Sequence, residues 1–205
     1  MTDTVGHSRG PFKALTPIEV PPEMDRFVTA MRRLQDLAVS ADPNDAVWTA
    51  AAEQVDELCA LLADHVVPPQ DAPAGRATGI PGLGHPLMPP WTATESGPDG
   101  VTMRGYFTRF HVGGNNAVHG GVIPLLFDWL FGMIVTAAAI PLSRTAYLHV
   151  DYRRVTPIEQ PLIVRGGVDS VAGRKAYLSA AMTTLDGTLL AEANGLMVAL
   201  LPHHS

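Results

Sequence analysis

The chain has 205 residues, of which 46% are hydrophobic and 17% charged, a composition typical of a globular domain with a substantial core and room for an extension. The net charge of −6, without any basic block, argues against a nucleic-acid-binding surface. Cys59 is the only cysteine, which excludes an intrachain disulfide and leads us to expect a cytoplasmic protein.

The N-terminal part of the chain predicts a tail followed by two helices. Residues 1–22 lack the apolar core of a signal peptide and are expected to form a flexible tail. Residues 23–65 are helical in pattern, and Asp42-Pro43 predicts the N-cap and first position of the second helix. Each helix has an apolar stripe: Met24, Phe27, Val28, Met31 and Leu34 in the first, and Trp48, Ala51, Val55, Leu58 and Leu62 in the second. We therefore predict a helical hairpin that packs on the domain or in an oligomer contact.

Residues 66–90 are rich in proline and glycine. This composition predicts a linker or a loop that lies over the domain. Leu83, Leu87 and Met88 are apolar residues through which part of the segment can pack down.

Residues 91–201 predict an α+β domain. One strand precedes a long apolar helix and four strands follow it, with turns at Ala172-Gly173 and Asp186-Gly187. The expected strands are 101–111, 145–154, 162–171, 174–185 and 188–200, and the expected helix is 122–140. This order predicts an antiparallel sheet wrapped around one long apolar helix.

The helix at 122–140 is long enough to suggest a transmembrane span. Pro124, Asp128 and Gly132 interrupt it, and an aspartate in the middle of a bilayer is costly. No basic cluster flanks the segment to orient it. We therefore predict a helix buried by a sheet and no membrane span.

The start of this helix combines groups that suit acyl-transfer chemistry. The sequence His119-Gly120-Gly121 precedes it, and the unpaired N–H groups of a first helical turn can bind an oxyanion. Asp128 follows Gly121 by seven residues, about two turns, so it lies on the same face of the helix, as does Gly132, which leaves space beside the carboxylate. Partial burial would make this carboxylate a better base near neutral pH.

The spacing of these groups predicts a dimer. Gly120 and Asp128 lie roughly 12 Å apart along a helix, so one carbonyl group cannot touch both within one chain. If both act in one reaction, the second group comes from another subunit, and we expect an obligate homodimer, with a tetramer also open.

A resemblance to a known family now becomes specific. The HGG-x6-D pattern on an apolar helix resembles hotdog-fold acyl-CoA thioesterases of the PaaI-like group. The segment TAYLHVDYRRVTPI, with its T-x-x-L-x-V-x-Y-x-R pattern, is similar to the family's first strand after the helix, and VAGRKAYLSAAMTTLDGTLLAEANGLMVAL resembles its last two strands. The resemblance covers roughly residues 91–200 and leaves out the helical hairpin.

The resemblance implies roles for individual residues. Asp128 would activate water against the thioester carbonyl, and the Gly120 amide of the partner chain would bind the oxyanion. His119 would hold the turn and the carbonyl, and Thr145 would orient the water. Gly121 and Gly132 are expected to border the substrate. An asparagine upstream of the HGG is common in the family. Asn115 and Asn116 are the candidates here, although they lie closer to the histidine than usual.

The substrate implied is an acyl-CoA, with no cofactor and no metal needed. Its phosphates require cations, and the candidates are Arg153, Arg154, Arg174 and Lys175. The acyl group is left open between aryl and fatty acyl. Two alternatives are a non-catalytic acyl-CoA-binding or regulatory hotdog protein and a hotdog hydratase or dehydratase. Asp128 argues against the former, and the HGG before it favours the thioesterase over the latter.

Overall fold

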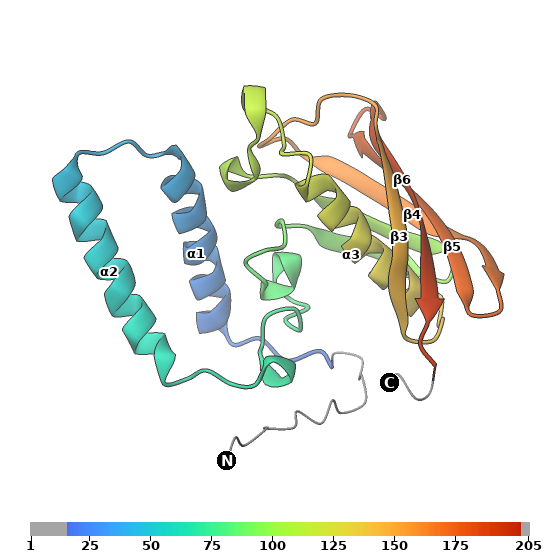
Figure 1. The fold of residues 1–205 in the computed structure, drawn as a ribbon, viewed down its shortest axis with the longest axis horizontal. Helices are drawn as coiled ribbons and strands as arrows, with labels where there is room; N and C mark the ends of the chain where they lie inside the picture. Colours follow the sequence, from blue (N-terminus) through green and yellow to red (C-terminus); the bar gives the residue numbers. More distant parts are fainter. Residues whose placement is uncertain (1–15, 202–205) are drawn as a thin grey trace, which may run out of the picture.

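The structure is a computed structural model that describes residues 16–201, and its main body is one sheet wrapped around one helix (Figure 1). The sheet has six strands in the order β1-β2-β4-β5-β6-β3, with all neighbours antiparallel. The strands are β1 (Thr92–Gly97), β2 (Gly100–Gly105), β3 (Ser143–Tyr152), β4 (Leu162–Ala172), β5 (Lys175–Thr184) and β6 (Leu189–Ala199). Helix α3 (Val122–Ala137) lies against the concave face of this sheet. The fold is the hotdog fold, as expected.

The core forms between α3 and the alternating inward residues of the strands. Phe127, Leu130 and Phe131 of α3 are fully buried, and the inward positions of β5 include Leu178 and Met182. Strand alternation places every second residue on this face, while the helix places residues three and four apart on it. The apolar character of the helix is therefore explained by burial against the sheet on most of its circumference.

Two glycines let the sheet approach the helix closely. A Cβ atom at Gly195 would lie 2.7 Å from the Phe131 ring and 2.9 Å from the Tyr147 carbonyl oxygen. A Cβ at Gly166 would lie 2.7 Å from the Ala180 Cβ and 3.0 Å from the Ile134 side chain. Side chains at these positions would push α3 off the sheet, so the glycines set how tightly the sheet wraps the helix.

The strand predictions hold after the helix and fail before it. The single strand expected at 101–111 is β2, which ends at Gly105, and the chain then forms a 3₁₀ turn, η3 (Arg109–His111). Strand β1 was not predicted, because its sequence TATESG is polar and its residues are almost all exposed at the sheet edge. The four later strands and the turn glycines Gly173 and Gly187, both with positive φ, lie where the sequence places them.

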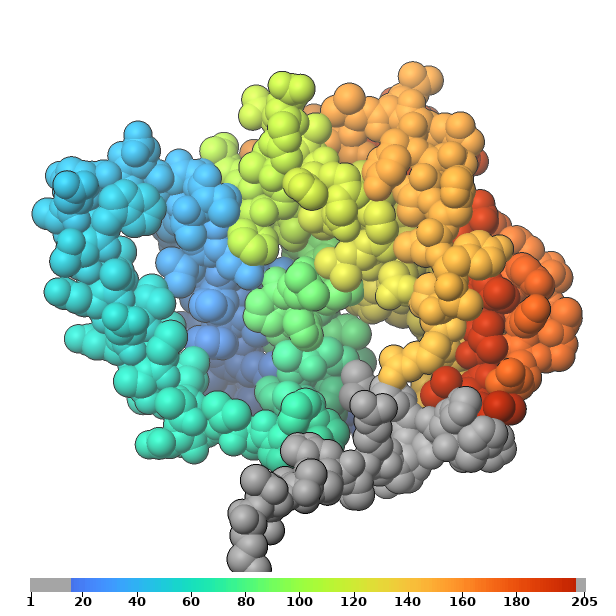
Figure 2. All heavy atoms as spheres, in the orientation of Figure 1, coloured from blue at the N-terminus to red at the C-terminus, as the bar shows by residue number. Residues whose placement is uncertain are grey.

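The N-terminal extension contains two helices, α1 (Pro22–Ser40) and α2 (Asp45–Ala63), which run in opposite directions as expected for a hairpin (Figure 1). The second helix begins later than predicted: the side chain of Asn44, not Asp42, caps it by accepting a hydrogen bond from Val47 N–H. Only α1 packs on the domain. Helix α2 buries no residue, and its apolar stripe is uncovered in the single chain, with open space between it and α1 (Figure 2).

The segment 66–90 packs against α1. It contains two 3₁₀ turns, η1 (Pro69–Asp71) and η2 (Pro81–Gly84), and its Ala77 and Ile80 form a small buried cluster with Val28. Of the predicted tail, residues 1–15 lie outside the described residues. Residues 16–21 are held to this segment, because Ile18 N–H donates to Arg76 O at 3.1 Å. Across residues 16–201, no helix is long and apolar enough to cross a bilayer.

Candidate active site

Asp128 is positioned on the one face of α3 that the sheet does not cover. Its side chain is exposed in the single chain, contrary to the partial burial we expected, because Asp128 lies beside the edge strand β3 and not under the sheet that buries the neighbouring Phe127. A Cβ atom at Gly132 would meet nothing within 4 Å, so there is open space one turn further along this face. The carboxylate of Asp128 therefore lies on the exposed face of an otherwise apolar helix.

Thr145 of β3 contacts this carboxylate directly. Its hydroxyl donates a hydrogen bond of 2.6 Å to Asp128 Oδ1 and lies 3.2 Å from the Met197 sulfur. The hydroxyl fixes the orientation of the carboxylate, and the other carboxylate oxygen, Oδ2, makes no side-chain hydrogen bond among residues 16–201. The structure thus brings together the two residues expected to activate and orient water.

A β-bulge explains why Thr145 reaches the helix. Simple alternation along β3 would place Thr145 on the face opposite Leu148, but the structure places both on the same face. The register between β3 and β6 shifts between Thr145 and Tyr147, which inserts one extra residue, Ala146, into β3. A bulge changes the phase of a strand, so Thr145 and Leu148 both face α3.

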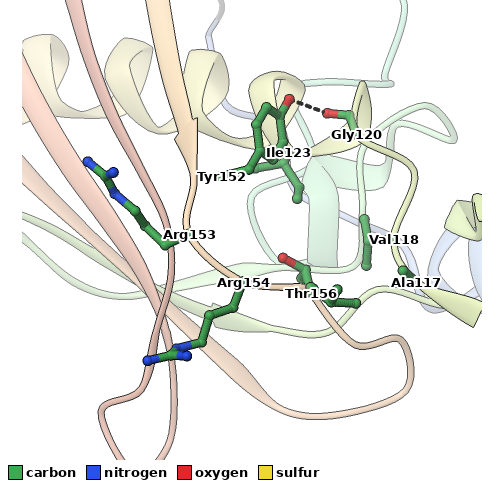
Figure 3. A pocket seen from close by; sticks show the side chains of 9 residues that line it. Ala117, Val118, Gly120, Ile123, Tyr152, Arg153, Arg154 and Thr156 are labelled. Carbon is green, nitrogen blue, oxygen red and sulfur yellow. Dashed lines mark hydrogen bonds between the residues drawn. The ribbon is translucent and has the colours of Figure 1, made fainter.

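The HGG turn is held by two side chains. His119 Nδ1 accepts a hydrogen bond of 3.0 Å from Gly121 N–H, so the His119 side chain contacts the turn. The hydroxyl of Tyr152, at the end of β3, donates to the Gly120 carbonyl oxygen at 2.7 Å (Figure 3). The Gly120–Gly121 peptide is therefore fixed at its carbonyl and at its N–H. The Gly120 N–H makes no hydrogen bond within the described residues and is available to a ligand.

A pocket of about 490 Å³ opens beside this turn (Figure 3). It is lined by Ala117, Val118, Gly120, Ile123, Tyr152, Arg153, Arg154, Val155 and Thr156. Thr156 is only 4% exposed, and its hydroxyl makes no hydrogen bond among residues 16–201. A buried hydroxyl without a partner is costly, so this group is available to a polar atom of a ligand. Tyr152 and Thr156 were not predicted from the sequence as site residues. Tyr152 is the Tyr of the T-x-x-L-x-V-x-Y-x-R pattern, whereas no sequence pattern indicated Thr156.

The candidate cations separate into two groups. Arg153 and Arg154 line the pocket, whereas Arg174 and Lys175 lie by the β4–β5 turn, at the end of the sheet where Ser143 pairs with Ala199. Arg153 is bound to Glu192 at 2.8 Å and Asp151 at 3.3 Å, and the hydrogen bond to Glu192 raises the pKa of Arg153. Arg174 donates to the Ala199 carbonyl at 3.0 Å. Within one chain, only Arg153 and Arg154 can serve the pocket.

The two asparagines have a backbone role in this structure. Asn115 and Asn116 lie in an exposed 3₁₀ turn, η4 (Gly114–Asn116), with φ of 58° and 56°. Asparagine is one of the few residues that adopts this left-handed conformation readily, which accounts for both positions. Neither side chain contacts Asp128 in the single chain, so their part in catalysis stays a prediction.

Comparisons with known proteins find similarity to thioesterases. A family model described as Thioesterase superfamily matches residues 115–191, which include α3, Asp128 and Thr145. A crystal structure of a thioesterase superfamily protein superposes with a TM-score of 0.75 at 27% identity, covering 89% of this chain and 97% of that one. The chain is also similar in fold, with a TM-score of 0.50 and 15% identity over 53% of this chain and 86% of the other, to a hypothetical thioesterase protein with coenzyme A from Streptococcus pneumoniae TIGR4.

A curated relative has a stated activity. The chain is 30% identical over 89 residues to the acyl-coenzyme A thioesterase THEM4 of Bos taurus, which covers 43% of this chain and 36% of the relative. The chain therefore spans little more than a third of the length of this relative.

Proposed function

We propose that the protein is an acyl-CoA thioesterase that hydrolyses an acyl- or aryl-CoA to a free acid and CoA. The observation that carries the proposal is the 2.6 Å hydrogen bond between Thr145 and Asp128 on the uncovered face of α3. A carboxylate fixed at one oxygen and available at the other is suited to take a proton from water. The similarity to THEM4 supports the thioester as substrate.

In the proposed reaction, Asp128 accepts a proton from water while the water oxygen bonds to the thioester carbon. The carbonyl oxygen becomes an oxyanion, which the Gly120 N–H stabilises, and its neighbouring peptide is already fixed by Tyr152 and His119. The tetrahedral intermediate then breaks its C–S bond, and the thiolate of CoA leaves and takes up the proton from Asp128. Every proton transfer in this proposed reaction uses Asp128, and the oxyanion is stabilised by the protein backbone.

The proposed active unit is a homodimer. Strand β3 is the longer of the two edge strands, with ten residues against six in β1, and such an edge is a template for pairing with another strand. Pairing of β3 with β3 of a second copy would place the two α3 helices side by side. Asp128 of one chain would then face the Gly120 N–H of the other, as their separation along one helix requires. We also propose that the protein belongs to the PaaI-like group of these thioesterases and is located in the cytoplasm.

The pocket beside the turn is proposed to hold the pantetheine and phosphate parts of CoA. Thr156 offers a buried hydroxyl to an amide of the pantetheine arm. Arg154 has no side-chain hydrogen bond within the described chain, so its guanidinium is free for a phosphate, whereas Arg153 is engaged by two carboxylates. Arg174 and Lys175 would reach a nucleotide only from another copy.

Release of thiol from a panel of acyl- and aryl-CoAs, measured with a thiol reagent, tests the activity. Hydrolysis that disappears in Asp128→Asn supports the proposal. Binding of acyl-CoA without thiol release would identify a non-catalytic binding protein, and water addition to an enoyl-CoA would identify a hydratase. Either result would overturn the proposal.

A mixed dimer tests whether the site is shared. Asp128→Asn and Gly120→Val homodimers should each be nearly inactive. If the site is shared, subunit exchange pairs an intact Asp128 with an intact Gly120 in one of the two sites of each mixed dimer. About half of the dimers are mixed after exchange, so activity returns to about a quarter of wild type. Activity that stays at the level of the separate variants, while subunits exchange and both variants are folded, would place the site within one chain.

A further inference from the structure

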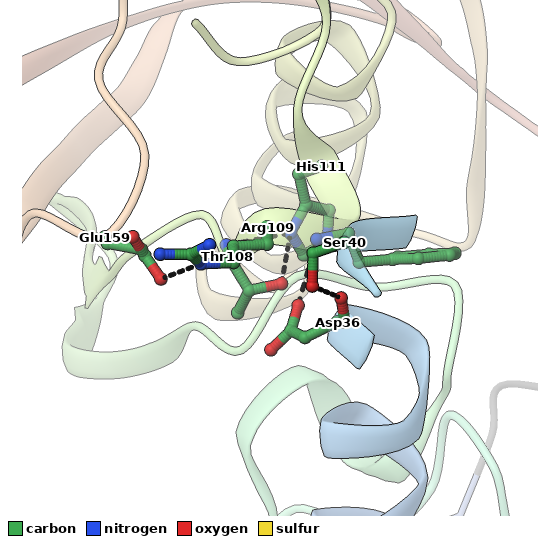
Figure 4. Close-up of polar contacts among 7 residues, drawn as sticks. Asp36, Ser40, Thr108, Arg109, His111 and Glu159 are labelled. Atoms are coloured by element: carbon green, nitrogen blue, oxygen red, sulfur yellow. Dashed lines mark hydrogen bonds and ion pairs between the residues drawn. The ribbon is translucent and has the colours of Figure 1, made fainter. Parts of the chain in front are cut away.

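Helix α1 is held by side chains that bind backbone atoms of the hotdog domain and of the segment 66–90. Asp36, near the end of α1, accepts a hydrogen bond of 2.9 Å at Oδ1 from the backbone N–H of Phe110 in η3. Arg32, one turn earlier, donates to the carbonyl oxygens of Met88 at 2.8 Å and Pro81 at 3.0 Å. Helix α1 packs against η3, and among the described hydrogen bonds of α1 the one made by Asp36 is the one that reaches this turn (Figure 4).

The turn that Asp36 holds is also closed by hydrogen bonds of its own. Thr108 N–H donates to His111 Nδ1 at 3.0 Å, and the Thr108 hydroxyl lies at the same distance from that nitrogen. His111 is 4% exposed, and burial lowers its pKa, although the nearby Asp36 acts in the opposite direction. The imidazole is therefore neutral at physiological pH, as its role as acceptor requires. The Phe110 amide therefore lies within a turn whose two ends, Thr108 and His111, are hydrogen-bonded to each other.

The same turn holds the HGG segment from its other side. The His111 carbonyl oxygen accepts a hydrogen bond of 2.8 Å from His119 N–H, and Gly113 N–H donates to Ala117 O at 2.7 Å. The two segments pack so closely that a Cβ atom at Gly113 would lie 2.9 Å from the His119 Cα. The position of η3 therefore sets the position of the His119 backbone, from which the Gly120 and Gly121 peptides follow.

We propose that Asp36 is a positioning residue of the active site, through which the N-terminal helix α1 fixes η3 and thereby the HGG turn. The proposal rests on the proposed thioesterase function for its kinetic consequence, and on the hydrogen bonds alone for its structural one. It gives the extension a role in the reaction that acts through the HGG turn.

The test compares three variants of the full chain. Asp36→Ala removes the acceptor and the charge, Asp36→Asn keeps an acceptor oxygen without the charge, and Asp56→Ala removes an exposed carboxylate from the middle of α2 as a matched control. Hydrogen exchange of the peptide that covers residues 117–121 reports on the HGG turn. Thiol release from acyl-CoA gives kcat and KM.

The expected result is about fivefold faster exchange at the His119 amide in Asp36→Ala, from the loss of one hydrogen bond, with Asp36→Asn and Asp56→Ala near wild type. The kcat value should fall by about the same factor while KM is kept, because the turn acts on the oxyanion of the transition state. A change confined to the Phe110 amide, with His119 exchange and kcat unchanged, overturns the proposal.

Two further outcomes are also decisive. A wild-type protein that hydrolyses no acyl-CoA overturns the proposed function, whereas the exchange at His119 still decides whether Asp36 positions the turn. If Asp36→Ala does not fold, Asp36→Glu displaces the carboxylate by one methylene and takes its place in the same comparison. Exchange at His119 equal to that of Asp56→Ala then overturns the proposal.

Discussion

Replacing Thr145 by valine removes the hydroxyl that holds Asp128 and keeps the shape of the side chain. The bond lost is short, 2.6 Å, and its acceptor is ionised. Hydrogen bonds to charged groups contribute about 1.5–3 kcal/mol, and an exposed site favours the lower end of that range. Because the bond orients the base, about 1.5 kcal/mol of transition-state stabilisation should be lost, which is roughly tenfold in kcat. Asp128→Asn should cost about 10²-fold or more, since it removes the base itself.

The assay is thiol release at saturating acyl-CoA, with Thr145→Ser as the variant that keeps the hydroxyl. Thr145→Ser should retain most of the activity, and KM should change little in either variant. Thr145→Val with wild-type kcat would show that the contact only stabilises the strand. Thr145→Val as inactive as Asp128→Asn would show that the hydroxyl takes part in the chemistry itself.

Three further outcomes are expected. Tyr152→Phe should lower kcat about fivefold at constant KM, because it frees the Gly120 peptide from a 2.7 Å hydrogen bond; an unchanged kcat would remove Tyr152 from the oxyanion site. Thr156→Val should raise KM about fivefold and leave the melting temperature equal or higher, since the hydroxyl has no partner within residues 16–201; an unchanged KM would refute its contact with the substrate. Gly195→Ala should destabilise the fold by about 1–3 kcal/mol in chemical unfolding, whereas Gly97→Ala, at a site where a Cβ meets nothing within 4 Å, should destabilise it much less.

The sequence predicts those parts of the fold that have strong local periodicity. Helix α3 and the four strands after it combine an apolar pattern with glycine turns, so their order and the hotdog fold follow from residues 122–200. Strand β1 carries no such pattern, because an edge strand with one polar, exposed sequence buries almost nothing. The place of β1 in the sheet is set by its pairing with β2, and this pairing has no signature in the local sequence of β1.

The candidate site was predictable in its residue types and not in its contacts. The HGG and Asp128 follow from spacing along one helix, which obeys a fixed geometry. The contact of Thr145 with Asp128 depends on a bulge in β3, and one inserted residue reverses the face expected from alternation. The Tyr152 and Asp36 contacts join segments far apart in the chain, and each depends on the folded arrangement of the whole domain.

The close approach of Gly195 to Phe131 has a consequence for how such sequences can diverge. The two positions share one volume, since the ring of Phe131 occupies the space that a side chain at 195 would need. A larger residue at 195 is therefore tolerated only with a smaller one at 131, and the order in which the two substitutions arise matters. Shrinking Phe131 first leaves a cavity, whereas enlarging Gly195 first forces α3 off the sheet and disturbs Asp128, which lies one turn before Phe131 and is bonded to the neighbouring strand β3. The path through the cavity is therefore the one that preserves the site.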